Sequence, residues 1–359
     1  MEREFKNGSV IKGKDLAHKV LCKVLSEDMC ASGFQYQIGI NDDTEQVTSK
    51  GDSEARLGFC IIENVCNFIY RGSLLALVEV PENEDVCEED KEYRTHRLVI
   101  KKVLKLNKVA TWKYLRRNGA NITADDNIAI RYMARYGYLK SVKYLHKNGA
   151  DLTANNNYAV RWAAENGHLK VVKYLHKNGA DITTDMNSAV RWAAENGYLD
   201  VVKYLRENGA DIIAKDNYAV RYAAKNGHLK VLKYLYQNGA DITAGENGAL
   251  RWAAENGHLE VVKYLHQNGA CIYDANNNAL YMAALNGHLN VVKYLRENGL
   301  FNGVADIRAL KYAAVNGHLN VVKYLHEDGV KLSLIDSYYI RKIKTYGHKD
   351  VLKYIQEHM

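Results

Sequence analysis

The stretch NGHLKVVKYL at residues 166–175, closed by NGADI at residues 178–182, decides the fold of this chain. It returns with small changes every thirty residues through most of the 359-residue sequence. Strict self-similarity at a period between about 20 and 50 residues predicts a solenoid of stacked units. Two sets of glycines mark the period: Gly119, Gly149, Gly179, Gly209, Gly239, Gly269, Gly299 and Gly329, and Gly137, Gly167, Gly197, Gly227, Gly257, Gly287, Gly317 and Gly347.

Each unit is expected to fold as a pair of helices. Asn157 is the expected N-cap of a first helix with a face of alanine and valine, and Gly167 ends this helix in the left-handed conformation of a C-terminal cap. A second helix follows at once, with an aliphatic stripe that includes Val172 and Leu175, and the next Asn-Gly pair ends it. One such pair is too small to fold alone, so stacking on its neighbours buries its core.

The quoted stretch resembles the second half of an ankyrin repeat. Ankyrin repeats usually open their first helix with Thr-Pro-Leu-His, whereas residues 158–161 read Tyr-Ala-Val-Arg, and the period is about three residues shorter than usual. Both departures fall at the protruding β-turn finger, which puts in doubt partner binding through the finger tips. This thirty-residue, tyrosine-rich version resembles the ankyrin proteins that giant viruses of amoebae, of the mimivirus kind, encode in large numbers.

The expected fold is mainly α: an ankyrin-repeat solenoid of stacked helix pairs at residues 97–359, preceded by a small α/β leader domain at residues 1–96. About nine units begin near residues 97, 127, 157, 187, 217, 247, 277, 307 and 337. The first unit is degenerate, with helical apolar spacing over residues 97–107, and the last unit is atypical. Both ends suit the polar caps that a solenoid needs.

The leader contains none of the repeat. Its apolar spacing predicts a helix over residues 14–30, a strand over 33–40, a helix over 61–70 and a strand over 74–80, which the chain's one proline, Pro81, ends. These elements resemble the leader domain found ahead of the repeats in those viral ankyrin proteins. The resemblance attaches no activity to it.

Charge divides the chain in the same place. Residues 1–96 hold 11 Lys and Arg against 19 Asp and Glu; the remaining 38 basic against 23 acidic residues leave the solenoid a balance of +15. The N-terminus is charged where a signal peptide needs an apolar stretch, and no apolar run approaches the roughly 20 residues that span a bilayer. A cytoplasmic protein is therefore expected, in the host cytoplasm if viral. The six cysteines show no C-x-x-C pair, which favours reduced thiols over a zinc site or disulfides.

Candidate partner-binding residues are those that vary between otherwise similar units, because stacking does not constrain them. They match positions that ankyrin proteins use for partners, on the helix that looks onto the concave face. Three aromatic residues lie beside them. The candidates that open the first helix are Tyr158, Ser188 and Tyr218, those that close it are Glu165, Glu195, Lys225, Glu255, Leu285 and Val315, and the aromatic residues are Trp162, Trp192 and Trp252.

Three further rows of residues repeat with the period and have a structural interpretation as well as a functional one. An arginine row could grip bases or an acidic peptide, but packing between repeats, with each arginine paired to a glutamate four residues on, is favoured. A lysine row on the second helix predicts a solvated outer face, with phosphate binding as the alternative. A histidine row after the first helix predicts backbone hydrogen bonds, since no ligand spacing for a metal accompanies it. The rows are Arg131, Arg161, Arg191, Arg221 and Arg251; Lys113, Lys143, Lys173, Lys203, Lys233, Lys263, Lys293, Lys323 and Lys353; and His168, His228, His258, His288, His318 and His348.

The sequence carries no phosphate-binding loop, nucleophile motif or isolated carboxylate pair. It therefore predicts a non-catalytic scaffold, with no cofactor, metal or small-molecule substrate, that binds a protein partner on the concave ankyrin surface and acts on host components if viral. The alternative is a basic solenoid that binds nucleic acid or a phosphorylated partner.

Overall fold

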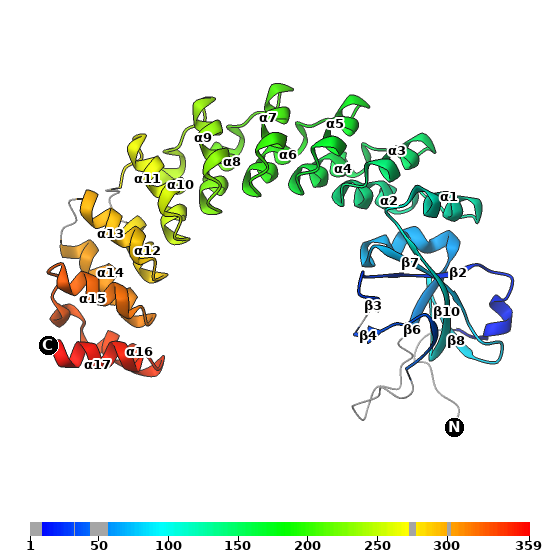
Figure 1. The fold of residues 1–359 in the computed structure, drawn as a ribbon, viewed down its shortest axis with the longest axis horizontal. Helices are drawn as coiled ribbons and strands as arrows, with labels where there is room; N and C mark the ends of the chain where they lie inside the picture. Colours follow the sequence, from blue (N-terminus) through cyan, green and yellow to red (C-terminus); the bar gives the residue numbers. More distant parts are fainter. Residues whose placement is uncertain (1–8, 32, 44–56, 273–277, 300–302) are drawn as a thin grey trace. The chain divides into compact units, whose positions relative to one another are not determined.

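The computed structural model describes residues 9–31, 33–43, 57–272, 278–299 and 303–359 (Figure 1). By its internal contacts the chain divides into two compact units, residues 1–163 with 170–181, and residues 164–169 with 182–359. The first unit holds a β-sheet and the first helix pairs, and the second holds the later helix pairs.

The first unit begins with an eight-stranded sheet in which every neighbouring pair of strands is antiparallel. Its strand order is β1-β8-β9-β6-β2-β7-β10-β5, and β3 and β4 form a separate two-stranded sheet. The bounds are β1 Ser9–Lys12, β2 Leu21–Leu25, β3 Cys30–Ala31, β4 Phe34–Gln35, β5 Gly39–Asp42, β6 Leu57–Ile61, β7 Leu74–Glu79, β8 Asp85–Glu89, β9 Glu92–Thr95 and β10 Arg97–Lys105, with two 3₁₀ helices, η1 Gly13–Leu16 and η2 Ile62–Arg71.

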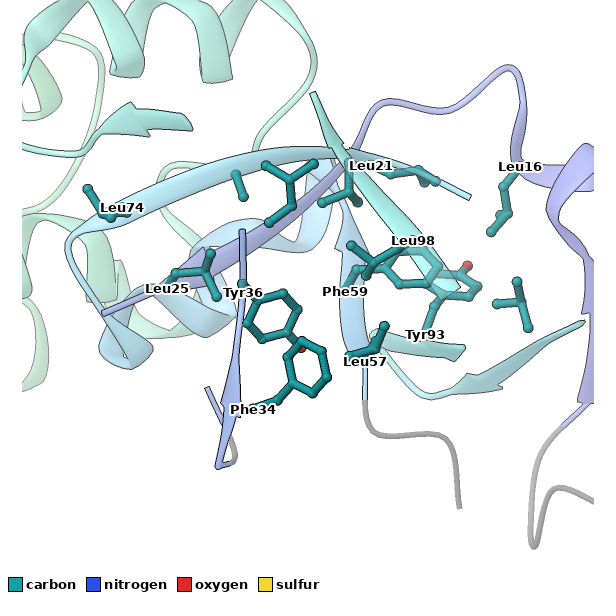
Figure 2. Close-up of a cluster of buried hydrophobic side chains, with 14 residues drawn as sticks. Leu16, Leu21, Leu25, Phe34, Tyr36, Leu57, Phe59, Leu74, Tyr93 and Leu98 are labelled. Carbon is teal, nitrogen blue, oxygen red and sulfur yellow. The ribbon is translucent and has the colours of Figure 1, made fainter. Parts of the chain in front are cut away.

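A core of leucine, valine and aromatic side chains holds this sheet together (Figure 2). Leu25 and Leu57 are completely buried, and the rings of Phe59 and Tyr93 stack with their centroids 5.6 Å apart. All five residues of β2 are buried, because β2 lies between β6 and β7 and carries covered side chains on both faces.

Two of the helix predictions made from the sequence are wrong. Residues 14–30 contain only the short η1 before β2, whose buried run lacks the alternation that would have marked it as a strand. Residues 97–107 are not the first helix of a repeat: β10 pairs with both β5 and β7, and Leu98 and Ile100 lie in the sheet core. The first repeat therefore keeps only its second helix.

The other predictions for the leader are confirmed fully or in part. The strand expected over residues 74–80 is confirmed as β7, and the helix over 61–70 is the 3₁₀ helix η2. The strand over 33–40 is interrupted, since β4 ends at Gln35 and β5 begins at Gly39. The mainly helical solenoid after a small N-terminal domain is confirmed.

Helix pairs follow the sheet as the period predicts. In the second unit α6, α8 and α10 contact one another in sequence as a row of first helices (Figure 1). The bounds are α1 Val109–Arg117, α2 Ala124–Arg135, α3 Leu139–Lys147, α4 Ala154–Glu165, α5 Leu169–Lys177, α6 Thr184–Glu195, α7 Leu199–Glu207, α8 Ala214–Lys225, α9 Leu229–Gln237, α10 Ala244–Glu255, α11 Leu259–Gln267, α12 Asn278–Leu285, α13 Leu289–Asn298, α14 Gly303–Val315, α15 Leu319–Glu327, η3 Leu332–Leu334, α16 Ser337–Thr345 and α17 Lys349–His358.

Each first helix from α2 to α10 opens with three residues in the left-handed region, which we call the finger turn. In α6 these are Asp185, Met186 and Asn187, with φ between 51° and 60°. The third residue is always asparagine, which tolerates this conformation better than most residues. The finger turn of the unit that begins near residue 277 lies outside the described residues.

Candidate functional site

Five candidate residues of the second unit, together with Tyr222, form a half-buried row along α6, α8 and α10. We call this row the helix-1 strip and define it as Trp192, Glu195, Tyr222, Lys225, Trp252 and Glu255. It arises because the opposite face of each helix, alanine and valine or leucine, is completely buried, as at Ala193 and Ala194 in α6. The aromatic and charged face is therefore the one that stays within reach of solvent.

Contacts between neighbouring repeats order the middle of the helix-1 strip. The Tyr218 hydroxyl donates a 2.9 Å hydrogen bond to Glu195 Oε2, and the rings of Tyr218 and Tyr222 stack with centroids 3.8 Å apart. Burial, and then the bond to Glu195, raise the pKa of the Tyr218 phenol. Tyr218 thus remains a neutral donor at physiological pH and ties α8 to α6.

The lysine of the helix-1 strip lies over aromatic rings. The Lys225 ammonium is 5.4 Å from the Tyr222 centroid and 5.8 Å from the Trp252 centroid. The rings of Tyr222 and Trp252 meet edge to face at 5.0 Å. Such cation–π contacts attract the ammonium group to the faces of the aromatic row.

Two of the candidate residues are inaccessible. Ser188 is completely buried, and its hydroxyl has no hydrogen-bond partner; Val315 is 6% exposed. Neither residue contributes to a solvent-facing surface. Glu165 and Leu285 are half-buried, like the residues of the helix-1 strip.

The candidates of the first unit repeat the same aromatic packing. The Tyr158 and Trp162 rings meet edge to face at 4.6 Å, and Tyr132 meets Trp162 at 5.0 Å. The Arg161 guanidinium lies 4.3 Å from the Tyr158 centroid. Aromatic side chains here pack within and between repeats, as the packing interpretation requires.

Three arginines of the row are buried, Arg221 and Arg251 are half-buried, and all five bind backbone carbonyls. Arg131, Arg161 and Arg191 are only 7%, 6% and 4% exposed. Each arginine of the row donates from Nη2 to the first carbonyl of its own finger turn, six residues back: Asp125, Asn155, Asp185, Lys215 and Gly245.

The ion pair expected between Arg191 and Glu195 is wrong. Arg191 Nη2 bonds the Asp185 carbonyl at 2.9 Å and its Nε bonds the Met186 carbonyl at 2.9 Å, while Glu195 accepts from Tyr218. Side chains in a helix lean toward its N-terminus, so the arginine reaches back to the finger turn instead of forward.

The lysine row is mostly exposed, as expected, and several of its lysines also cover a tyrosine of the next repeat. In the second unit the ammonium groups of Lys203, Lys233 and Lys323 lie between 5.2 and 5.5 Å from the ring centroids of Tyr234, Tyr264 and Tyr354. Each of these three tyrosines therefore packs against a lysine on the second helix of the preceding repeat.

The histidine row makes the backbone hydrogen bonds that its position predicts. His288 Nε2 donates to the Glu255 carbonyl at 2.9 Å, and His318 Nε2 donates to the Leu285 carbonyl at 2.8 Å. Each ring thus satisfies a carbonyl near the end of the first helix in the preceding repeat, a group that lacks an intrahelical partner.

The asparagine at the third position of each described finger turn forms a row whose links between repeats the sequence did not reveal. In the second unit Asn187 Oδ1 accepts a 2.9 Å hydrogen bond from the Asp211 amide, and Asn217 Oδ1 accepts the same bond from Asp241. Asn157 makes this bond to Asp181 and is not the helix cap that the sequence suggested. Its recurrence at thirty-residue intervals was the available signal, but the link spans 24 residues and needed the tertiary structure.

We also searched the described residues for a metal site, a membrane span and paired cysteines. Among the described residues no group of three or more His, Cys, Asp or Glu could hold a metal ion, and no described helix is long and apolar enough to cross a membrane. All six cysteines are free thiols, and Cys22 and Cys60 lie opposite each other on β2 and β6 with their sulfurs 3.8 Å apart.

The stacked helix pairs and finger turns define a repeat protein of the protein-interaction class. A family model described as ankyrin repeats, three copies, matches residues 130–216, 185–245, 215–276 and 250–336, more than half of the chain. The chain therefore belongs to the ankyrin repeat family, whose repeats serve as scaffolds for protein interaction and are generally not enzymes.

Three curated relatives are proteins of Acanthamoeba polyphaga mimivirus. One, described as an ankyrin repeat protein, is 30% identical over 128 residues, 32% of this chain and 42% of the relative. An uncharacterized protein is 29% identical over 133 residues, 34% of this chain and 95% of the relative. A second ankyrin repeat protein is 28% identical over 137 residues, 36% of this chain and 67% of the relative. The chain is an ankyrin repeat protein of the mimivirus type, although it matches less than half the length of the first relative.

Proposed function

We propose that this protein binds a protein partner along the helix-1 strip. The observation that carries the proposal is the contrast between the two faces of the first helices in the second unit. Their stacking faces are completely buried and nearly identical between repeats, whereas the strip alternates Glu195, Lys225 and Glu255 at half-buried positions. Charges that differ from repeat to repeat on an ordered aromatic row suit recognition of one polypeptide segment.

The backbone bonds of the arginine row, and the burial of three of its five members, argue against the alternative of nucleic-acid binding on this face. A guanidinium bonded to a finger-turn carbonyl and shielded from solvent is not available to a phosphate. The exposed lysines of the second helices remain as a cationic surface, and their attraction for phosphates would be lost in salt.

The similarity to mimivirus proteins suggests where the binding takes place and which organism supplies the partner. We infer that the partner is a host component and that binding takes place in the host cytoplasm. The division of the chain into a leader and a repeat array is part of the proposal, with the boundary set after β10 instead of at residue 96.

The test is capture of amoebal host proteins by the full chain and by a charge-reversed variant, Glu195→Lys with Lys225→Glu and Glu255→Lys. The matched control is Lys203→Glu with Glu207→Lys and Lys233→Glu, which reverses three charges on second helices. Helix content of both variants should match that of the parent, because the changed side chains lie outside the buried core. The strip variant loses the bond from Tyr218 to Glu195, so a slightly lower thermal midpoint is expected for it, and capture is compared at a temperature where both variants are folded.

A partner that is lost by the strip variant and retained by the control supports the proposal. If every captured partner survives reversal of the helix-1 strip, that face is not the binding face. Quantitation by titration of the purified partner should show at least a tenfold loss of affinity, the size expected when several interface charges are reversed.

A further inference from the structure

Two exposed apolar side chains interrupt an otherwise polar edge of the second unit. Met186, in the finger turn of α6, is 63% exposed, and Ile213, just before α8, is 50% exposed. Between residues 182 and 272, all of which are described, they are the exposed large apolar side chains. Exposed apolar groups that cluster often mark an interaction site.

The neighbouring repeats show that the fold does not require apolar residues at these places. The position of Met186 is Asp126, Asn156, Asp216 and Glu246 in the other described finger turns. The position of Ile213 is threonine in the flanking repeats, where Thr243 hydroxyl donates a 2.7 Å bond to Asp241. Ile213 gives up that bond, so its side chain has no evident role in folding.

The chain segments that carry the two side chains are joined by a hydrogen bond. The bond between the Asp211 amide and Asn187 Oδ1, 2.9 Å long, joins the residue after Met186 to a residue two before Ile213. Arg191 fixes the Met186 carbonyl from inside the repeat. The surface is therefore largely ordered before any partner arrives, which lowers the entropy cost of binding.

The surroundings of this apolar pair are acidic. Five carboxylate residues along the finger turns and the loops before them are exposed in this part of the unit, against one exposed lysine, Lys215. This finger edge is acidic although the solenoid as a whole is basic. The five residues are Asp185, Asp211, Asp216, Asp241 and Glu246.

From this juxtaposition we propose that the finger edge around Met186 and Ile213 docks a basic polypeptide segment of the partner, with one aliphatic or aromatic side chain seated between them. The inference rests on the proposed function and specifies the partner's chemistry. Lysine and arginine of the segment complement the carboxylates and guide the encounter, and the apolar side chain supplies the buried contact. The shortened finger turns, which the resemblance placed in doubt as binding elements, are then part of the interface.

The test is selection of displayed random peptides of about sixteen residues on the full chain, without bias in composition. Selected peptides are then titrated against a double variant, Met186→Asn with Ile213→Thr. Both replacements are residues that neighbouring repeats carry at the same positions, so the variant should fold and unfold like the parent. The charge-reversed helix-1 strip variant serves as the second arm.

Enriched peptides that are basic, carry a central apolar residue and lose at least tenfold in affinity for the double variant support the inference. Peptides without basic residues, or peptides that bind the double variant unchanged, overturn it. Peptides that lose affinity only for the strip variant overturn it while leaving the proposed function intact, and failure to select any peptide counts against both. A dimer of the parent that the double variant dissociates would assign this edge to self-association and also overturns the inference.

Discussion

At the scale of single residues, Lys23 is a charged side chain buried in the sheet of the leader. It is 5% exposed, donates to the Gly58 carbonyl and lies 4.8 Å from the Tyr36 ring centroid. Burial is the main cause that lowers its pKa from 10.5 to about 8. Burial of an amine disfavours the charged form, and a lowered pKa in the folded state means that charge on Lys23 opposes folding.

The pH dependence follows from the sign of that shift. Between about pH 8 and 10.5 the unfolded chain binds more protons at Lys23 than the folded chain, so stability gains with rising pH through this window. Relative to Lys23→Met, the parent should gain up to about 3 kcal/mol between pH 7 and 10.5. Urea unfolding of both proteins at several pH values measures the difference, and parallel stability curves would contradict the prediction.

Asn247 illustrates the asparagine row. Its φ is 58°, and its Oδ1 accepts a 3.0 Å bond from the Cys271 amide. Asn247→Gly should lose only the hydrogen bond, about 1 kcal/mol, because glycine accepts a positive φ. Asn247→Ala should lose about 1 kcal/mol more, because alanine also strains the backbone. Equal stability of the two variants in urea would show that the left-handed conformation carries no cost here.

At the scale of elements, the step between the two helices of a repeat depends on a ring from the next repeat. A Cβ on Gly257 would lie 2.5 Å from Nδ1 of His288, whose Nε2 is bonded to the Glu255 carbonyl. Gly269 also has a positive φ, but a Cβ there would meet nothing within 4 Å. The two glycines share backbone strain and differ in the ring contact.

Gly257→Ala should therefore destabilise more than Gly269→Ala. Both variants incur the left-handed penalty of about 1 kcal/mol, and Gly257→Ala adds displacement of the His288 ring and loss of its bond, about 1 to 2 kcal/mol more. Thermal unfolding measures the difference. It should shrink in a His288→Ala background, and a difference that persists there would assign the effect to something other than the ring.

The residue pattern predicts the repeat helices correctly but fails for two strands of the leader sheet. The repeat helices follow from periodic alanine, valine and leucine, which the tertiary structure buries where the pattern places them. Strand β2 offers no such pattern, because all five of its residues are buried, Lys23 included, and the run therefore lacks the alternation that marks a half-buried strand. Strand β10 combines helical spacing with burial of Leu98 and Ile100, and only its pairing with β5 and β7 identifies it.

At the scale of the whole molecule, charge is distributed by face rather than as one basic surface. Four of the basic residues behind the +15 of residues 97–359 lie on β10, and the +11 of the repeats resides largely on second helices and in the arginine row, whereas the described finger edge of the second unit is acidic. A mixed-sequence single-stranded oligonucleotide of roughly thirty nucleotides should therefore bind weakly, and its binding should vanish by about 150 mM salt. Fluorescence anisotropy across a salt series tests this, and submicromolar binding at that salt would restore the nucleic-acid alternative.

For this protein, thirty-residue periodicity by itself determined the class of fold and the helix pairs, and it placed Trp192, Glu195, Lys225 and Glu255 at corresponding positions of the first helices. Such features are local and repeated, so spacing and composition specify them. Tertiary structure alone decided the burial of Ser188 and Val315, the bonds from arginine to the finger turns and the asparagine links between repeats. The asparagine links and the burial of Ser188 and Val315 depend on which groups the neighbouring repeats bring near, which spacing within one unit does not contain. The arginine bonds depend on the left-handed backbone of the finger turn in the same repeat, which the residue pattern does not reveal.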